Sequence, residues 1–190
     1  MRHQYAQPRN GSEAATATQA AAATLSFAFR ETSLGVALIA ATSKGVRTIF
    51  LGDERPALLG ELRQSAPSAI PAPPGSAVDE WADDVAAWLD APGSELAAPL
   101  DMKGTEFQRA VWNELREIPF GATTTYTEIA SRIGRPRAVR AVAGACAMNS
   151  LAVAVPCHRV VRSDGNISGY RWGVELKRRL LERESLRADD

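Results

Sequence analysis

The segment Thr125–Met148, TYTEIASRIGRPRAVRAVAGACAM, contains the pattern that decides the fold of the second half of this 190-residue chain. Thr125 and Glu128 have the spacing of a capping box, which predicts that a helix begins there. Gly134 is typical of a helix end, and Pro136 predicts that another helix starts at once. Two short helices joined by this Gly-Arg-Pro turn predict a helix-turn-helix.

The second of these helices, predicted over Arg137–Met148, has two unlike faces. Its apolar face has the i, i+3, i+4, i+7 spacing of a buried stripe and consists of Val139, Val142, Ala143 and Cys146. Its other face consists of Arg137, Arg140, Ala141 and Gly144. Two guanidinium groups among small side chains suit a close approach to a DNA minor groove or to the position of a displaced base. The pattern also fits a helix that packs against the rest of the protein with its arginines in surface ion pairs, so this helix alone leaves DNA contact open.

Helical patterns also lie on both sides of this segment. Thr105 and Gln108 form another capping box, and the helix that they predict ends at Pro119. Its apolar stripe consists of Phe107, Val111, Leu115 and Ile118. A last helix, predicted at roughly 173–184, has a stripe of Lys177, Leu180, Leu181 and Glu184. A buried carboxylate is costly unless it is paired, so His158 or an arginine is a candidate partner of Glu184. The residues alone favour the alternative, in which Lys177 and Glu184 extend to solvent.

The first half of the chain has a different pattern. Leu25, Phe27 and Phe29 alternate, and the apolar runs 36–41 and 46–51 follow. These three segments predict an antiparallel meander. Helical patterns come next, at about 53–64 and 78–89, with a proline-rich stretch from 67 to 75 between them.

The predicted fold class is therefore α+β, with three divisions of the chain. Residues 1–24, rich in Ala, Ser, Thr and Gln, are expected to be a flexible leader. Residues 25–98 are expected to be a small antiparallel-sheet domain with helices. We interpret that domain as a scaffold, because no titratable cluster with catalytic spacing stands out in it. Residues 99–190 are expected to be a mostly helical domain that contains the helix-turn-helix.

The charge is distributed unevenly along the chain. The formal net charge is zero, which by itself argues against a nucleic-acid partner, since binding phosphates needs a cationic surface. Residues 1–100, however, hold 7 Lys and Arg against 11 Asp and Glu, whereas residues 101–190 hold 15 against 11. The second half is therefore the part suited to DNA.

The chain has only two cysteines, Cys146 and Cys157. Nothing resembles a signal peptide or an apolar run long enough to span a bilayer, so we expect a cytoplasmic protein with free thiols and no membrane partner. A structural zinc usually needs four Cys or His ligands, and the other candidates are His3 and His158 alone, so we expect no metal.

The two cysteines have different surroundings. Cys146, on the apolar face of its helix, is expected to be a core residue. Cys157 follows an apolar run that ends in Pro156 and precedes His158. A thiol is nucleophilic only as thiolate, and with a free pKa of about 8.5 it needs a cationic or hydrogen-bonding partner, for which His158 is the candidate. In an extended segment the two side chains would point to opposite faces, so they need not touch and a water could relay the proton.

Pro156-Cys157-His158-Arg159-Val160 is similar to the alkyl-acceptor motif of the methylated-DNA–protein-cysteine S-methyltransferases, which accept the alkyl group of 6-O-alkylguanine. The resemblance covers about residues 103–184. It extends, in order and spacing, to Gly104-Thr105, Phe107-Gln108, Val111-Trp112, Ile118-Pro119, Gly121, Tyr126, Arg140-Ala141-Val142, Asn149, Gly169-Tyr170, Gly173, Lys177, Leu180-Leu181 and Glu184. Ser168-Gly169-Tyr170-Arg171-Trp172-Gly173 is similar to the C-terminal portion of the bacterial adaptive-response members, whose zinc-binding, transcription-activating part has no counterpart in these residues.

The resemblance implies a ribonuclease-H-like N-terminal domain and a catalytic site. Cys157 would accept the alkyl group, His158 would act as base through a bound water, and Glu184 would orient His158. Tyr126 would help to rotate the nucleotide and donate a proton to the guanine. Asn149 would brace the turn between the recognition helix and the active-site strand, and Lys177 would lie near the acceptor. No cofactor is implied.

The resemblance also implies that a monomer binds double-stranded DNA in the minor groove and extrudes the alkylated guanine. Arg140 would fill the gap in the base stack, and the Tyr170 backbone would contact the oxygen of the lesion. The other expected DNA contacts are Arg137, Ala141, Gly144 and Arg159. The substrates would be 6-O-methylguanine and 4-O-methylthymine, and each molecule would react once. Some relatives have a small residue where this chain has Trp172 and several have proline in place of Ala152, which suggests that Trp172 narrows the pocket in favour of methyl groups.

Three other functions fit parts of the pattern. A non-catalytic sensor of alkyl lesions would use the same helix-turn-helix, but such proteins lack the acceptor cysteine. A cysteine hydrolase could use Cys157 and His158, although no oxyanion site is evident. A DNA-binding regulator would need only the basic surface.

Overall fold

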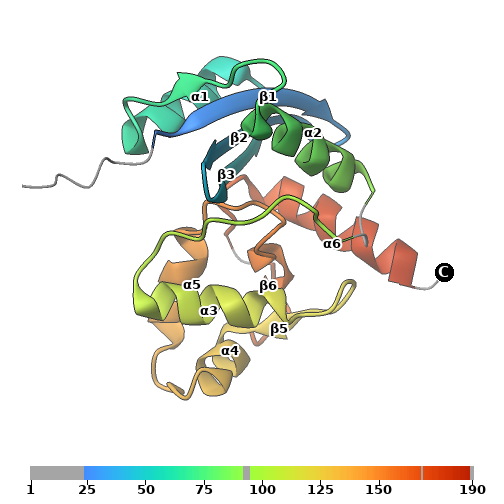
Figure 1. The fold of residues 1–190 in the computed structure, drawn as a ribbon. Helices are drawn as coiled ribbons and strands as arrows, with labels where there is room; N and C mark the ends of the chain where they lie inside the picture. The colour runs from blue at the N-terminus through green and yellow to red at the C-terminus, as the bar shows by residue number, and fades with distance from the viewer. Residues whose placement is uncertain (1–23, 92–94, 168, 189–190) are drawn as a thin grey trace, which may run out of the picture.

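The computed structural model describes residues 24–91, 95–167 and 169–188, so the predicted leader, residues 1–24, lies outside it except for Thr24. The N-terminal part is a four-stranded sheet with helices packed against it (Figure 1). The strands are β1 (Ser26–Thr32), β2 (Gly35–Thr42), β3 (Gly45–Gly52) and β4 (Ile70–Pro71). The first three form an antiparallel meander, as predicted, and the short β4 pairs in parallel with β1. The order across the sheet is β3-β2-β1-β4.

The apolar run of β2 is explained by burial on both faces of the sheet. The two helices of this part are α1 (Arg55–Ser65) and α2 (Ala77–Asp90). Successive side chains of a strand point to opposite faces. Leu38 shares a core cluster with Leu58 of α1, whereas Ile39 belongs to the cluster that contains Val85 of α2. Each helix therefore covers one face of the sheet.

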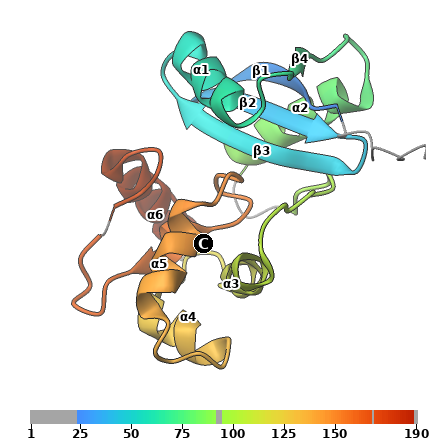
Figure 2. The same cartoon turned by 90° about the vertical axis from the view of Figure 1, so that its left-hand side faces the viewer.

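The second part consists of helices (Figure 2) and one small strand pair (Figure 1). Its elements are α3 (Glu106–Arg116), β5 (Thr124–Thr125), α4 (Tyr126–Arg132), α5 (Val139–Ala147), the single 3-10 turn η1 (Cys157–Arg159), β6 (Val160–Val161) and α6 (Val174–Ala188). Strands β5 and β6 pair in parallel. The predicted α+β class, with a sheet followed by a mostly helical part, is confirmed.

Both predicted capping boxes form. The Thr105 hydroxyl accepts from the Gln108 backbone N–H at 3.2 Å, and Gln108 Oε1 accepts from the Thr105 N–H at 2.9 Å. Thr125 and Glu128 make the corresponding pair of bonds, at 3.2 and 2.8 Å, at the start of α4. Each box satisfies backbone donors that the first turn of a helix leaves unpaired, so these local residues determine where α3 and α4 begin.

The prediction that Pro136 opens the second helix is wrong, because α5 begins only at Val139. The chain makes a turn first: the Arg135 N–H donates to the carbonyl of Ala130 at 2.8 Å, and the Ala138 N–H donates to the carbonyl of Arg135 at 2.8 Å. These bonds keep the segment attached to the end of α4, so Pro136 lies within the turn.

The segment that leads to Cys157 is fixed to the sheet by backbone hydrogen bonds. Near its start, β3 pairs with residues 99–101. Further along, the Ile49 N–H donates to the carbonyl of Ser150 at 2.8 Å, and the Ile49 carbonyl accepts from the Ala152 N–H at 3.1 Å. These bonds cover parts of the β3 edge that no other strand pairs with. They also hold the chain that leads to Cys157 in place.

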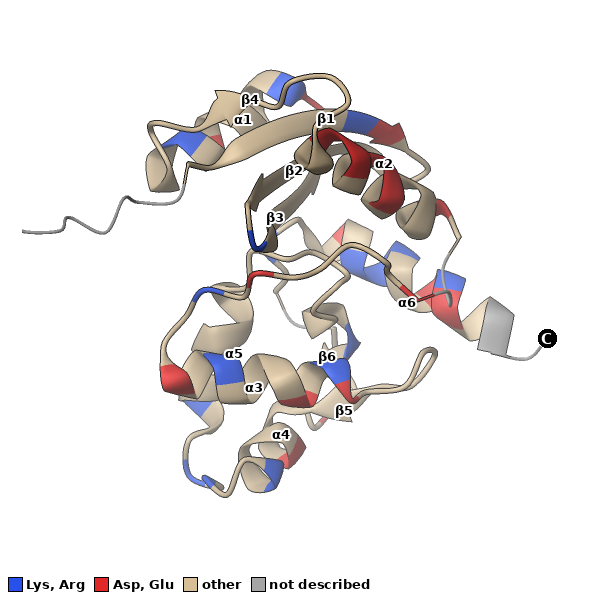
Figure 3. Cartoon of the chain, viewed as in Figure 1, with Lys and Arg blue, Asp and Glu red and all other residues tan. Residues whose placement is uncertain are grey.

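Charge is also segregated in the structure. Figure 3 shows the acidic residues gathered on α2 and basic residues at the turn between α4 and α5. The acidic residues of α2 are Asp79, Glu80, Asp83, Asp84 and Asp90. In residues 24–91, 95–167 and 169–188, no helix is both long and apolar enough to cross a membrane.

Candidate active site around Cys157

Cys157 lies in a tight turn between α5 and α6. The thiol side chain belongs to the core and is only 5% exposed. Its N–H donates to the carbonyl of Val155 at 2.7 Å, and the Arg159 N–H donates to the carbonyl of Pro156 at 3.0 Å. The expectation of an extended segment is therefore wrong, because the chain around Cys157 makes consecutive turns, one of which contains Val153 at a positive φ of 64°. Cys146 is buried in the core of α5, as predicted.

Asn149 connects the end of α5 to the thiol of Cys157. Its side-chain amide donates to the Val155 carbonyl at 2.8 Å and to Cys157 Sγ at 3.2 Å, and its Oδ1 accepts from the Leu151 N–H at 2.9 Å. One fully buried amide thus fixes the turn before the cysteine and also donates directly to the sulfur. The second contact has a chemical effect, since a donor to sulfur stabilises the thiolate.

Burial nevertheless dominates the acid strength of Cys157. It raises the pKa of the thiol, and the hydrogen bond from Asn149 and the positive charge of Lys177 only partly oppose that rise. Lys177 is itself fully buried and donates from Nζ to the carbonyl of Val160 at 2.6 Å. Cys157 is therefore protonated near neutral pH, and a nucleophilic reaction needs a base to remove the proton.

His158 and Glu184 form a buried pair next to the cysteine. His158 Nε2 lies 2.8 Å from Glu184 Oε1. The predicted alternative, in which Lys177 and Glu184 extend to solvent, is wrong, because both side chains are buried and bonded. Both candidate partners of Glu184 are used, since Arg159 also binds the carboxylate, through Nε at 2.8 Å and Nη2 at 3.0 Å.

The protonation of this pair follows from its contacts. Burial acts to raise the pKa of Glu184, but the hydrogen bonds and charges of His158 and Arg159 lower it to about 2. Burial lowers the pKa of His158 despite the opposing effect of Glu184. An ionised carboxylate can only accept, so Nε2 of the neutral imidazole carries the proton that it donates to Glu184. His158 Nδ1 is then a free lone pair, and it has no hydrogen-bond partner among the residues that the structure describes.

The residues predicted to contact DNA lie mainly on one surface. Arg137, Arg140, Ala141 and Gly144 are exposed, on α5 and the turn before it. Tyr126, the first residue of α4, is partly buried. Arg159 does not belong to this surface, because its guanidinium binds Glu184 and the carbonyl of Ile118 and its side chain is 12% exposed. The geometry therefore places Arg159 beside the buried His158–Glu184 pair, whereas the prediction placed it at the DNA.

The segment before α6 reaches the site from another direction. The Tyr170 ring is nearly perpendicular to that of His158, with centroids 6.3 Å apart. The Tyr170 hydroxyl is buried without a partner among the described residues. Residue 168, which begins the Ser-Gly-Tyr-Arg-Trp-Gly stretch noted in the sequence, lies outside those residues.

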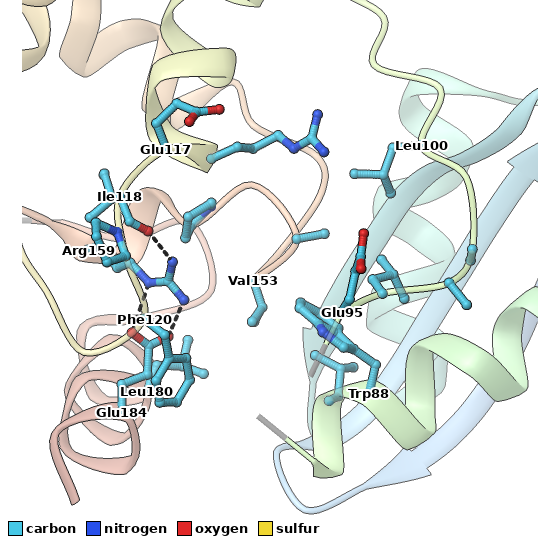
Figure 4. Close-up of a pocket in the computed structure, with 18 of the residues that line it drawn as sticks. Trp88, Glu95, Leu100, Glu117, Ile118, Phe120, Val153, Arg159, Leu180 and Glu184 are labelled. Carbon is cyan, nitrogen blue, oxygen red and sulfur yellow. Dashed lines mark hydrogen bonds and ion pairs between the residues drawn. The ribbon is translucent and has the colours of Figure 1, made fainter. Parts of the chain in front are cut away.

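A cavity of about 630 Å³ lies between the two parts of the molecule (Figure 4). Trp88 and Leu100 line one side of it, and Phe120, Arg159 and Glu184 line the other. Cys157 and His158 are not among its lining residues. The cavity thus borders the Glu184 carboxylate, whereas the Cys157 thiol does not line it. Within the described residues, no three His, Cys, Asp or Glu side chains are grouped to hold a metal ion.

Two features of the site were not evident from the sequence. Gly121 donates its N–H to Glu184 Oε2 at 3.2 Å, and Asn149 contacts the sulfur directly. Both contacts join residues that are distant along the chain or separated by turns. The spacing of Glu184 on the stripe of its helix was the one local signal for the buried carboxylate.

Comparison with known proteins identifies relatives of this chain. Residues 106–186 match the domain family "6-O-methylguanine DNA methyltransferase, DNA binding domain". The chain is 47% identical over 159 residues to the "Bifunctional transcriptional activator/DNA repair enzyme Ada" of Escherichia coli, with 84% of this chain and 45% of Ada covered. The chain therefore spans less than half the length of that relative.

Two further relatives match over most of their own length. The inducible methylated-DNA–protein-cysteine methyltransferase of Bacillus subtilis is 37% identical over 149 residues, which are 77% of this chain and 82% of that protein. The structure of Mycobacterium tuberculosis OGT in complex with DNA superposes with a TM-score of 0.71 at 33% identity, over 85% of this chain and 93% of that one. This chain belongs to the family of methylated-DNA–protein-cysteine methyltransferases.

Proposed function

We propose that this protein repairs DNA by transferring the methyl group of 6-O-methylguanine, and also that of 4-O-methylthymine, irreversibly to the sulfur of Cys157. The observation that carries the proposal is the buried His158–Glu184 pair beside the thiol, 2.8 Å between Nε2 and Oε1. That pair leaves His158 Nδ1 as an unbonded acceptor among the residues described. A buried thiol with a raised pKa needs such a base to remove its proton before it can react.

The reaction balances as a single displacement. His158 takes the thiol proton through a bridging water, and Glu184 and Arg159 keep the imidazole oriented while it becomes charged. The sulfur then bonds to the methyl carbon, the bond from that carbon to the guanine oxygen breaks, and its electron pair passes to the base. Tyr126 supplies a proton to the guanine and regains one from solvent, to which the His158 imidazolium releases the thiol proton. The proton lost by the thiol thus equals the proton gained by the guanine, and the thioether that remains ends the activity of that molecule.

We propose that α5 enters the minor groove of double-stranded DNA. Its exposed face of Arg140, Ala141 and Gly144 supports this arrangement, since small side chains let the helix backbone approach closely. Arg140 would fill the place of the extruded base, and Arg137 would contact the backbone next to it. Extrusion costs a few kcal/mol, and less for a lesion that pairs badly, which would favour damaged sites. The relative from M. tuberculosis was crystallised with DNA.

We further propose that the protein acts as a monomer in the reducing cytoplasm, where residues 25–98 support the catalytic part, residues 99–190. Its two cysteines are free thiols, which a cysteine acceptor requires. The presence of Cys157 favours this function over that of a non-catalytic sensor of lesions.

Methyl loss from DNA tests the proposal. A duplex with one 6-O-methylguanine is incubated with a stoichiometric excess of the protein and then digested to nucleosides. We expect loss of the modified nucleoside with the parent chain and with Cys146→Ser, and no loss with Cys157→Ser. Loss of the methyl group with Cys157→Ser would refute the acceptor role.

A further inference from the structure

We propose that Arg171 and Glu61 form a latch that holds the Tyr170–Trp172 segment closed over Cys157, and that the N-terminal part thereby controls which alkyl groups reach the sulfur. This inference rests on the proposed alkyl transfer and adds to it two residues that determine specificity. Glu61 lies on α1, in the part that the sequence identified only as a scaffold.

The latch consists of one ion pair and two cation–π contacts. Arg171 donates to Glu61 Oε1 from Nε at 2.8 Å and from Nη2 at 2.5 Å. The same guanidinium lies over the ring of Phe50 on β3, 4.9 Å from its centroid, and 5.9 Å from the ring of Trp172. Both charged side chains are about two-thirds buried or more. Arg171 is thus held by two elements of the N-terminal part at once.

A continuous row of aromatic rings connects the latch to His158, the proposed base. Trp172 packs against Phe50 with centroids 6.4 Å apart and against Tyr170 at 5.1 Å. Tyr170 in turn lies 6.3 Å from His158. Moving Arg171 away from Glu61 would also free Tyr170 and Trp172 to move, since these two residues flank Arg171 in the short segment before α6.

Three polar atoms indicate that this arrangement is a closed form. The Tyr170 hydroxyl, Trp172 Nε1 and His158 Nδ1 are buried without a hydrogen-bond partner among the described residues. Buried polar groups are almost always bonded, so these atoms lie in an enclosure that is completed by a bridging water, as proposed for His158 Nδ1, by a substrate, or by a different arrangement of the segment. Cys157 itself is only 5% exposed. A guanine can therefore reach the sulfur only after a part of the protein that covers it moves. Tyr170 and Trp172 pack against the core cluster that contains Cys157, and the latch opposes their movement.

The first test measures access to Cys157 without DNA. The variants are Glu61→Gln, Arg171→Gln and the charge-exchanged pair Glu61→Arg with Arg171→Glu. Arg63→Gln, an exposed charge on the same helix, is the matched control. Modification of each cysteine by iodoacetamide is followed by peptide mass spectrometry, and buried Cys146 reports any general unfolding.

We expect both single variants to react about fivefold faster at Cys157, the effect of removing a partly buried ion pair. Cys146 should stay protected, the exchanged pair should return toward the parent rate, and Arg63→Gln should match the parent. Equal rates at Cys157 in the parent and both single variants would overturn the latch. A faster reaction at Cys157 that is matched by a faster reaction at Cys146 would also overturn it, because it would indicate general unfolding.

The second test links the latch to specificity. Rates are compared for a duplex with 6-O-methylguanine and for free 6-O-benzylguanine, which carries a much larger group. We expect the single variants to accelerate the benzyl reaction more than the methyl reaction, and an equal effect on both would refute control of specificity. If the parent chain transfers no methyl group, the proposed function fails, whereas the iodoacetamide rates still decide whether the latch exists.

Discussion

At the scale of single residues, Glu184 is a buried, ionised carboxylate with hydrogen-bond donors from three other residues. It accepts from His158, from Arg159 and from the Gly121 N–H, in a buried position. Removing one partner from such a set leaves the other charge buried and uncompensated, which is strongly destabilising. The carboxylate therefore contributes both to the folded state and to the orientation of the base.

A pH-dependent stability follows for Glu184. Its pKa falls from an ordinary value of 4.5 to about 2 on folding. The stabilisation is complete above the unfolded value and is lost as pH falls from about 5 toward 2, with a total of about 3 kcal/mol. In urea unfolding, we expect the stability difference between the parent and Glu184→Gln to shrink over that range. Glu182→Gln, an exposed carboxylate of the same helix, should show no such trend. A difference that is constant with pH would contradict the assignment.

Asn149 should control the acid strength of the acceptor. Its amide donates to Cys157 Sγ and lowers a pKa that burial raises. In Asn149→Ala, we expect the midpoint of the pH–rate profile for iodoacetamide at Cys157 to move to higher pH, because the donor that lowers the pKa of the thiol is lost. Ser150→Ala, whose hydroxyl bonds to the Arg47 carbonyl away from the sulfur, should leave the midpoint unchanged. A midpoint that stays in place in Asn149→Ala would show that the contact has no effect on the thiolate.

At the scale of elements, the open surface of α5 at Gly144 would let DNA approach the helix backbone closely. A Cβ at this position would meet nothing within 4 Å. Replacing a helix glycine by alanine stabilises a helix by about 0.5–1 kcal/mol, so Gly144→Ala should unfold at higher urea concentration. Gly144→Leu should also fold but bind duplex DNA about tenfold more weakly in fluorescence anisotropy, because the side chain keeps the helix from the groove. Gly60→Leu on α1, where a Cβ is equally unhindered, is the control. Undiminished binding by Gly144→Leu would exclude this face of α5 from the DNA interface.

The elements also show which features a sequence can predict. The capping boxes at Thr105 and Thr125 were predicted correctly because both partners lie three residues apart, so the signal is local. The start of α5 was misplaced because the turn at Pro136 depends on a bond from Arg135 back to Ala130. The turns around Cys157 were missed for a similar reason.

The buried pair of His158 and Glu184 also depends on contacts between residues that are distant along the chain, which a local pattern does not show. An unpaired Glu184 would be expected at the surface. Its burial is explained by His158 and Arg159, which lie 26 and 25 residues away along the chain, and by the Gly121 N–H. The site residues themselves could be named from the resemblance. The pairing of Glu184 with His158 could be named in the same way, but the contact of Asn149 with the sulfur could not, and Arg159 was assigned to DNA although its guanidinium binds Glu184.

At the scale of the whole molecule, the two parts share one core. A single apolar cluster contains Ile49 of β3, Val85 of α2, Val111 of α3 and Val142 of α5. Backbone hydrogen bonds from β3 to residues 99–101 and 150–152 join the parts further. The latch of Arg171 and Glu61 is one more contact across the same boundary.

Unfolding should therefore be a single cooperative transition. We expect thermal curves from tryptophan fluorescence and from far-UV circular dichroism to coincide, because disrupting the sheet removes the support of the acceptor segment. Calorimetric and van't Hoff enthalpies should agree as well. Two separate transitions, with one part melting before the other, would show that the shared core does not couple them.

The central claim is that Cys157 takes one methyl group and keeps it. The most direct measurement is intact-mass spectrometry of the chain after incubation with an excess of duplex containing 6-O-methylguanine, followed by peptide mapping. We predict a single added methyl group, located on Cys157, with repair that stops at one lesion for each protein molecule. Repaired DNA beside an unmodified Cys157, or repair of many lesions by one molecule, would contradict the account.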